Sequence, residues 1–352
     1  MNYHESIQSK IVQPHISSIG TKILSVGTYL PSEVWTSDSI MSEINSEQNY
    51  DIPVNWMSEE MGILERRVSP FDAKPSELAI PAAQKAIDNL GINPDLIDMV
   101  LFCGIERDLP EPATAHIIQD KLGLNAMHAF DLSNACFGFM QAIETASHYL
   151  RSGAVRYALV CTGEIPSKIM RAAIDYLKTG IDKDEVQGLL GALTVGDAGG
   201  AIVLGQSEYD ENVGFKLFHT KTDSSYVEKF FYGVNTDGTY CGQMLMGKIV
   251  GASIWMHRKL IDDTLEMLGW DTFDWLLAHQ TGRRPFEKFQ ALSTVDADCV
   301  TKTYDTLANI TSATFPVNYE KMLGSGKVGA GSRIGGIHSG SGLVVGEFGY
   351  QM

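Results

Sequence analysis

The stretch Asp131-Leu-Ser-Asn-Ala-Cys136-Phe-Gly-Phe-Met-Gln-Ala-Ile-Glu-Thr-Ala-Ser-His-Tyr-Leu150 predicts a strand, a turn and a helix in succession. Residues 129–132 have the pattern of a buried strand end, and apolar residues then recur at helical spacing (Phe139, Ile143, Ala146 and Leu150). Cys136 therefore lies on the turn, at or near the helix N-terminus, where free N–H groups and the helix dipole favour a thiolate. This placement predicts a nucleophilic cysteine; the alternative is a buried structural cysteine, which is the commoner fate of a free thiol.

Composition excludes several classes of protein. The 352 residues are 44% hydrophobic and 20% charged, as in an ordinary globular chain with a large core. A formal net charge of -16 disfavours nucleic acid as a partner, because an acidic surface repels phosphates. Five scattered cysteines without a CxxC motif argue against a disulfide framework or a metal site, and no apolar run is long enough to span a membrane. With a polar N-terminus in place of a signal peptide, we expect a cytoplasmic protein.

Strand and helix patterns alternate along the whole chain. Strands are expected at 23–30, 99–104, 129–132, 157–162, 214–220 and 275–279, and helices at 76–90, 113–122, 249–268 and 284–291. Residues 221–247 have the composition of loops, and 335–348 of a glycine-rich loop that leads into a last strand. This alternation indicates an α/β protein with helices packed on sheets.

Three later features are candidate partners of Cys136. His279 ends a buried strand, where its side chain can project into a crevice, although a structural histidine fits equally well. Asn309 opens a helix, a position at which asparagine is often only an N-cap. The Gly340-Ser341-Gly342 stretch could present a backbone N–H to an oxyanion, or be simply a turn.

Together these features resemble the thiolase-fold condensing enzymes of the β-ketoacyl-acyl-carrier-protein synthase III type. The resemblance covers nearly the whole chain, through Gly62-Ile-x-x-Arg-Arg, Lys121-Leu-Gly, Asp131–Phe139, Ser152–Val160, Val195-Gly-Asp, His279-Gln, Asn309-Ile-Thr-Ser-Ala and the terminal glycine stretch. Within the family, the chain looks most similar to the head-to-head acyl-CoA condensing enzymes of bacterial olefin biosynthesis. That similarity is carried by Glu111-Pro112-Ala-Thr, Asn134-Ala-Cys136-Phe-Gly-Phe, Gly163-Glu164, Ala192-Leu-Thr-Val-Gly196 and Gly340-Ser-Gly-Leu343.

The resemblance implies a five-layer α/β/α/β/α thiolase fold built from two similar halves, in a homodimer. Residues 17–210 would form the half that carries Cys136, and residues 211–352 the half that carries His279 and Asn309. By resemblance, Cys136 takes an acyl group from a thioester, and His279 and Asn309 stabilise the enolate of a second thioester. The N–H groups of Cys136 and Gly342 would form the oxyanion hole. Acyl-CoA or acyl carrier protein thioesters are the expected substrates, with no permanently bound cofactor and no metal.

Glu111 is a departure from the general synthases. As the resemblance implies, those enzymes have a large apolar residue at this position, which reaches into the acyl pocket of the partner subunit. A carboxylate resembles the head-to-head subgroup, in which it acts as base on an acyl α-carbon. Burial would raise its pKa toward a range useful for a base. The alternative is an exposed loop glutamate between Pro110 and Pro112.

Two further departures concern the substrate entrance and its surroundings. The usual His-Gln-Ala-Asn is His279-Gln-Thr-Gly282 here, and Glu60 stands where general synthases often have an arginine. Trp56 and Arg284 occupy positions that line the entrance in relatives. Because CoA and carrier proteins are anionic, we expect a local basic patch, with Arg66, Arg67, Arg283 and Arg284 as candidates.

The sequence thus predicts a Claisen condensation that makes a β-ketoacyl product, either from a malonyl donor or from two acyl thioesters. One alternative is an acyltransferase on the same fold that passes the acyl group to oxygen or nitrogen. Another is a non-catalytic subunit of a condensing heterodimer, against which the intact set of Cys136, His279 and Asn309 argues.

Overall fold

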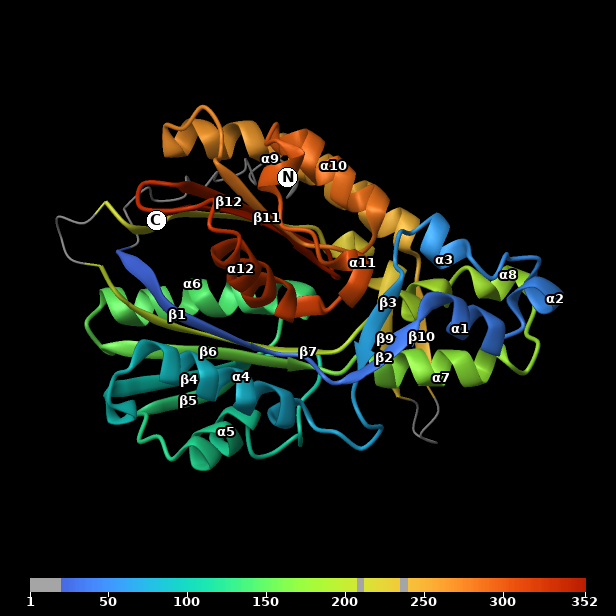
Figure 1. Cartoon of the computed structure of the whole chain (residues 1–352), viewed down its shortest axis with the longest axis horizontal. Coiled ribbons are helices and arrows are strands. Elements are labelled where there is room, and N and C mark those ends of the chain that lie inside the picture. Colours follow the sequence, from blue (N-terminus) through green and yellow to red (C-terminus); the bar gives the residue numbers. More distant parts are fainter. Residues whose placement is uncertain (1–19, 208–211, 235–239) are drawn as a thin grey trace, which may run out of the picture.

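Two β-sheets, packed on a shared layer of helices, organise the chain (Figure 1). The computed structural model describes residues 20–207, 212–234 and 240–352, so the polar N-terminus lies outside the described residues. Among the helices described, none is both long and apolar enough to cross a bilayer.

The first sheet has the strand order β1-β7-β6-β4-β5. Its strands are β1 (Thr21–Tyr29), β7 (Ala198–Gln206), β6 (Tyr157–Glu164), β4 (Ile97–Cys103) and β5 (His128–Leu132). β4 pairs in parallel with β5 and β6, so that Leu101 lies between Phe130 and Val160, whereas β7 runs antiparallel to β6 and β1. Apart from Asp98, the sequence of β4 is apolar, which suits a strand that is buried on both faces, as the sequence predicts.

The second sheet has the order β11-β12-β13-β8. It comprises β11 (Trp275–Ala278), β12 (Arg333–Gly340), β13 (Val344–Gln351) and β8 (Gly214–Thr222), with only β11 and β12 parallel. The expectation of a glycine-rich loop from residue 335 is wrong, because residues 335–340 belong to β12, while residues 344–348 lie in β13, the expected last strand. The glycines of β12 provide room for aromatic rings: a Cβ on Gly336 would lie 1.7 Å from Phe348 Cε1.

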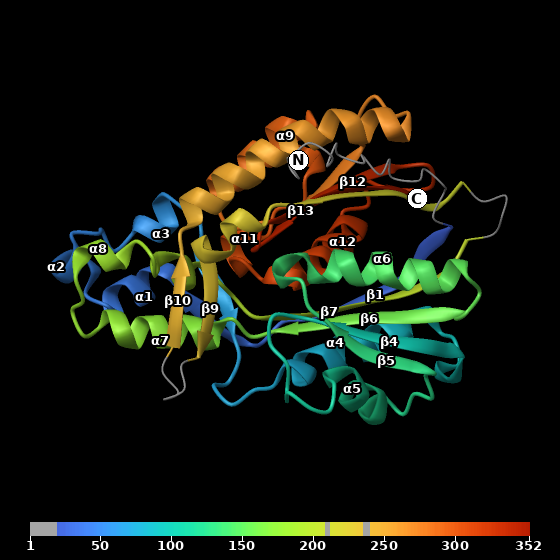
Figure 2. The ribbon, with the colours of Figure 1, turned by 180° about the vertical axis from the view of Figure 1, so that it is seen from behind.

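Helices cover both sheets and fill the space between them (Figures 1 and 2). α4 (Pro75–Leu90) and α5 (Thr114–Leu122) cover the outer face of the first sheet, and α9 (Met246–Leu268) and α10 (Arg283–Ser293) that of the second. α6 (Gly138–Arg151) and α12 (Thr314–Gly324) form the middle layer, where Phe139 stacks on Phe315 at 5.7 Å. The predicted five-layer α/β/α/β/α fold is confirmed.

A smaller group of elements extends from one end of the layers (Figure 1). It contains α1 (Ser37–Glu43), α2 (Ser46–Tyr50), α3 (Trp56–Glu59), α7 (Ser167–Leu177), α8 (Lys183–Val186) and the paired strands β2 (Glu33–Thr36) and β3 (Glu65–Val68). The hairpin of β9 (Phe230–Val234) and β10 (Tyr240–Met244) also lies there, in a stretch expected to be loops. α11 (Tyr304–Leu307) packs near β3.

The two sheets draw on separate parts of the chain. Strands of the first sheet lie between residues 21 and 206, and those of the second between residues 214 and 351. This supports the expected halves 17–210 and 211–352, whose division near residue 210 stays a prediction.

Candidate active site

Cys136 lies on the predicted turn, between the end of β5 and the start of α6. Residues Ala135–Phe137 form a short 3-10 turn, and Ala135 has φ +48°, a left-handed conformation that is uncommon for a residue with a Cβ. Gly340, at the end of β12, allows the second half to approach this turn closely. A Cβ on Gly340 would lie 3.0 Å from Phe137 N and 3.1 Å from Asn134 O.

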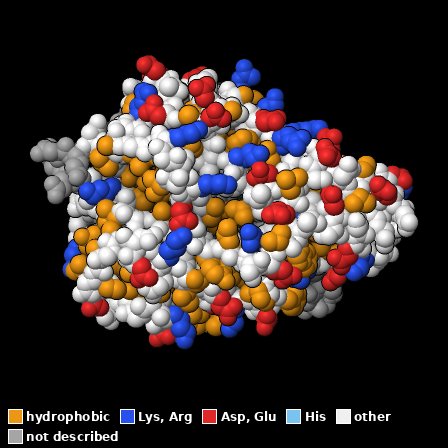
Figure 3. Space-filling view, viewed as in Figure 1, with side chains coloured by type: hydrophobic (Ala, Val, Ile, Leu, Met, Phe, Trp, Pro, Cys, Tyr) orange, Lys and Arg blue, Asp and Glu red, His pale blue; other side chains and the backbone are white. Residues whose placement is uncertain are grey.

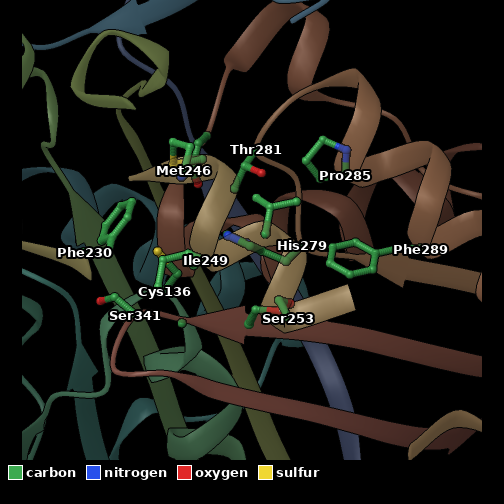
Figure 4. Close-up of a pocket in the computed structure, with 14 residues that line it drawn as sticks. Cys136, Phe230, Met246, Ile249, Ser253, His279, Thr281, Pro285, Phe289 and Ser341 are labelled. Atoms are coloured by element: carbon green, nitrogen blue, oxygen red, sulfur yellow. The ribbon is translucent and has the colours of Figure 1, made fainter. Parts of the chain in front are cut away.

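His279 and Asn309 share one cavity with Cys136. Figure 4 shows the side chains of Cys136 and His279 in this cavity. Most other side chains that line it are apolar: Phe230, Met246, Ile249, Val250, Pro285 and Phe289. The polar remainder comprises Ser253, Thr281, Ser339 and Ser341. The cavity volume of about 40 Å³ holds about three water molecules, at 10–15 Å³ for each. His279 and Asn309 follow Cys136 by 143 and 173 positions in the sequence, yet they line the same cavity.

His279 follows β11 directly, and its backbone N–H donates to Ile337 O at 2.8 Å. The residue is only 4% exposed, and this burial lowers the pKa of the imidazole to about 4, with a smaller contribution from His257. His279 is therefore neutral near pH 7. A neutral imidazole carries one N–H group, which can donate a hydrogen bond to a carbonyl or enolate oxygen.

Asn309 is held on both sides of its backbone. Its N–H donates to Thr194 O at 3.0 Å, and its C=O accepts from Gly196 N–H at 3.1 Å. The side-chain Oδ1 accepts from Thr311 N–H at 3.0 Å, as an asparagine does at the start of a turn. Because Oδ1 is engaged, the NH2 group is the part of the amide left to face a ligand in the cavity.

The expectation of a lowered pKa at Cys136 is wrong. Burial raises the pKa of this thiol to about 12, and the carboxylate of Glu164 adds to the increase. A hydrogen bond from the backbone of Cys136 itself lowers the pKa, but desolvation outweighs it. The resting thiol is therefore protonated, so iodoacetamide should not label Cys136 selectively near neutral pH.

Glu164, at the end of β6, is a buried carboxylate whose role the sequence leaves open. It accepts hydrogen bonds from the Ser312 hydroxyl and, at 3.2 Å, from Ile105 N–H. It therefore connects the turn after Asn309 to the loop that leads toward Glu111. Burial raises its pKa to about 7, despite these hydrogen bonds. The feature of the sequence that could have indicated this residue is a single glutamate in an otherwise largely apolar strand.

This pKa predicts a pH-dependent effect of Glu164→Gln on stability. Because the folded-state pKa of Glu164 is above its unfolded value, wild-type stability is lost as pH rises from about 4.5 through 7. The glutamine variant has no such loss. Its free energy of unfolding should therefore rise relative to that of the wild type by up to about 3 kcal/mol over that pH range. Urea titrations at pH 4.5 and pH 8 measure the difference.

Ser312→Ala provides the matched comparison. Removing the hydroxyl that stabilises the carboxylate should raise the Glu164 pKa further and extend the fall in stability to higher pH. If the difference in free energy of unfolding between Glu164→Gln and wild type were the same at both pH values, the raised pKa of the buried Glu164 would be contradicted.

Gly342, the expected oxyanion-hole residue, lies in the turn between β12 and β13 with φ +134°. The neighbouring residues Gly340 and Ser341 line the Cys136 cavity, but Gly342 is not among its lining residues. The structure thus places the turn at the cavity and leaves the donor role of Gly342 as a proposal.

Trp56 and Arg284 line a second, wider cavity of about 650 Å³. Met246 lines both cavities. Lys248 also lines the second cavity, while exposed Arg284 forms an ion pair with Glu60 at 2.7 Å. The role of Trp56 and Arg284 at a substrate entrance stays a prediction.

The expected basic patch is smaller than the sequence suggests. Arg66 is fully buried, and its guanidinium donates to Ser37 Oγ at 3.1 Å and to Leu193 O at 3.0 Å, so it holds the fold together and cannot meet a partner. Arg283 and Arg284 remain exposed. On the face drawn in Figure 3, acidic and basic side chains are intermixed.

Glu111 does not join the other candidates within one chain. It is exposed in the loop between β4 and α5, and it is not among the residues lining the Cys136 cavity. The expected burial is therefore absent from the single chain, and only another subunit could supply it.

Among residues 20–207, 212–234 and 240–352, no cluster of three or more His, Cys, Asp or Glu could hold a metal ion.

Comparisons with known proteins agree with this geometry. The family model for 3-oxoacyl-[acyl-carrier-protein (ACP)] synthase III matches residues 130–224, and that for its C-terminal part matches residues 266–350. The chain is 29% identical over 329 residues to the β-ketoacyl-[acyl-carrier-protein] synthase III of Neisseria meningitidis Z2491, covering 89% of this chain and 93% of the relative. The corresponding enzyme of Yersinia pestis is 28% identical over 335 residues, covering 92% and 99%.

Solved structures of OleA from Xanthomonas campestris share the fold. One variant superposes with a TM-score of 0.88 at 23% identity, over 96% of this chain and 99% of OleA. Another, with bound lauric acid and lauroyl-CoA, has a TM-score of 0.87 at 24% identity, over 95% and 99%. The two family models together span about half of the chain and include Cys136, His279, Asn309 and the terminal glycine stretch. The chain belongs to the 3-oxoacyl-[acyl-carrier-protein] synthase III family of thiolase-fold enzymes that condense thioesters.

Proposed function

We propose that this enzyme joins two simple acyl thioesters head to head, with Cys136, His279, Asn309 and Glu111 as its catalytic residues. The observation that carries the proposal is the convergence of Cys136, His279 and Asn309 on one apolar cavity. Glu111 is the feature that favours an acyl donor over a malonyl donor. The lauroyl-CoA held by the OleA structure is an acyl thioester of the kind proposed here.

The first half-reaction loads Cys136. Its sulfur attacks the thioester carbonyl, a new C–S bond forms as the old one breaks, and the thiol proton leaves with the departing thiolate. N–H groups of Cys136 and Gly342 would stabilise the oxyanion. Because the proton is transferred rather than lost, the raised pKa of the resting thiol is compatible with this exchange.

The second half-reaction requires a carbanion. Glu111 would remove a proton from the α-carbon of the second thioester, whose carbonyl oxygen accepts hydrogen bonds from His279 and the Asn309 NH2 group. The neutral state of His279 suits this donor role. The enolate then attacks the acyl carbon on Cys136, the C–S bond to Cys136 breaks, and a β-ketoacyl thioester results.

The entrance suits an anionic thioester carrier. Arg284 and Lys248 provide positive charge beside Trp56, and Met246 lies where this route meets the cavity of Cys136. CoA or an acyl carrier protein would thus bind outside while its acyl group reaches the sulfur. At about 40 Å³, the inner cavity must enlarge for a long acyl chain, and Met246 and Ile249 are the flexible apolar side chains that line it.

We propose that the enzyme works as a homodimer. Glu111 is exposed in its own chain and outside its own cavity, so it can act only if another subunit brings a cavity to it. The loop that carries it is fixed at its base: the Asp108 carboxylate accepts from Ser76 N–H at 2.9 Å, and Asp108 N–H donates to Thr114 Oγ1 at 3.2 Å.

His279→Ala and Asn309→Ala separate the two half-reactions. Both should leave acyl loading of Cys136 intact and lower condensation by about 100-fold or more each, because each removes a hydrogen bond to the enolate. Intact mass after incubation with acyl-CoA measures loading, and mass analysis of products measures condensation. Failure of either folded variant to acquire the acyl group would overturn the assigned roles.

A further inference from the structure

A chain of buried polar side chains lies between the second sheet and α9, behind the wall of the Cys136 cavity. Ser253 and His257 are on α9, Ser339 is on β12 and Glu347 is on β13. All four are buried, and the condensation chemistry uses none of them. A buried carboxylate and imidazole are costly to desolvate, so their presence beside a reaction cavity calls for a reason.

Hydrogen bonds link these four side chains in a single series, in which each donor can be assigned. His257 Nδ1 lies 3.2 Å from Glu347 Oε1, and His257 Nε2 lies 3.0 Å from Ser339 Oγ. A carboxylate oxygen accepts, so His257 donates from Nδ1 to Glu347 and accepts the Ser339 hydroxyl proton at Nε2. Ser253 Oγ, 2.6 Å from Ser339 Oγ, then donates to Ser339.

Only the serine end of this chain reaches the cavity. Ser339 and Ser253 line it together with Cys136, whereas His257 and Glu347 have no exposed side-chain surface. The order is therefore a hydroxyl facing the cavity, an imidazole behind it and a carboxylate behind the imidazole. This is the relation of nucleophile, general base and orienting acid in serine acyl-transfer enzymes.

Among the described residues, His257 is the hydrogen-bond partner of the Glu347 side chain. Oε1 of Glu347 accepts from the imidazole, while Oε2 is buried with no hydrogen-bond partner in that part of the chain. The carboxylate is thus placed to orient this imidazole.

We propose that Ser339 is a second nucleophile in this cavity, with His257 as its base and Glu347 as the residue that orients His257, and that together they hydrolyse acyl esters or thioesters. Ser339 Oγ attacks the carbonyl carbon, and its proton passes through His257 Nε2 to the departing alcohol or thiol as the C–O or C–S bond breaks. A water molecule then attacks the seryl ester, giving one proton to His257, which returns it to Ser339 Oγ. The products are a carboxylic acid and an alcohol or thiol, and the serine is regenerated.

The test uses the full-length Cys136→Ala protein, so that its outcome does not depend on condensation. A fluorophosphonate probe with an alkyl chain should add one phosphonyl group, and peptide mass mapping should place it on Ser339. Hydrolysis of a p-nitrophenyl acyl ester should persist in this background. Adding His257→Gln should lower both labelling and hydrolysis by at least about 100-fold, as expected for loss of a general base.

Ser341 provides the matched control, because it also lines the cavity but has no hydrogen bond to a histidine among the described residues. Adding Ser341→Ala should leave the phosphonyl adduct in place, whereas adding Ser339→Ala should abolish it. The position of the adduct is mapped in the Cys136→Ala protein, which keeps Ser339. The test therefore stays valid even if the Ser339→Ala variant folds poorly. No adduct, or an adduct on another residue, would overturn the proposal.

Discussion

Cys136→Ala is expected to abolish both acyl loading and condensation, with a loss of at least about 1,000-fold in rate, as for removal of a nucleophile from comparable acyl-transfer sites. Without the sulfur, the enzyme has no tethered acyl group for the enolate to attack. The protein should still fold, because alanine fills the small site on the turn before α6. Intact mass after incubation with acyl-CoA should show an acyl adduct on wild type and none on the variant.

Cys299→Ser is the matched control for this experiment. Cys299 is half-buried and is not among the residues lining the Cys136 cavity, so its loss should leave the acyl adduct unchanged. Buried Cys103 and Cys161 lie in the first sheet and are likewise absent from that lining. An adduct that persists in Cys136→Ala and maps to another cysteine would overturn the assignment.

Glu111→Gln is expected to stop the joining of two simple acyl thioesters while leaving Cys136 acylation intact. The α-proton of an unactivated thioester is weakly acidic, so loss of the base should cost about 100- to 10,000-fold. A malonyl thioester needs no such base, because loss of carbon dioxide generates the carbanion. Adding a malonyl thioester could therefore restore product in this variant. Product mass analysis with each donor measures the difference.

Mixed dimers test whether Glu111 acts across the subunit interface. In a dimer of Glu111→Gln with Cys136→Ala, an intact Cys136 on one chain would face an intact Glu111 on the other if the glutamate acts in trans. Such dimers should condense, whereas action in cis leaves no complete site. Undiminished acyl–acyl condensation by the Glu111→Gln homodimer would contradict the role of base altogether.

Local sequence patterns determined much of this fold. The strand, turn and helix around Cys136 follow from an apolar strand end and a helical repeat within twenty residues, and the structure confirms them. β11 ends at Ala278, one residue short of the predicted end at His279. The β9–β10 hairpin and β12 were missed, because short strands without apolar alternation and glycines that accommodate aromatic rings have the composition of loops.

Only the tertiary structure decided how the site behaves. The sequence by itself determined a cysteine at a helix N-terminus, a histidine at a strand end and an asparagine at a turn. It could not determine that desolvation raises the pKa of Cys136 and lowers that of His279, or that Arg66 is buried and Glu111 exposed. Nor could it place Ser339, His257 and Glu347 in one hydrogen-bonded chain. Helix and strand periodicity depend on near neighbours in the chain, whereas burial and the pKa values that follow from it depend on every element that packs around a residue.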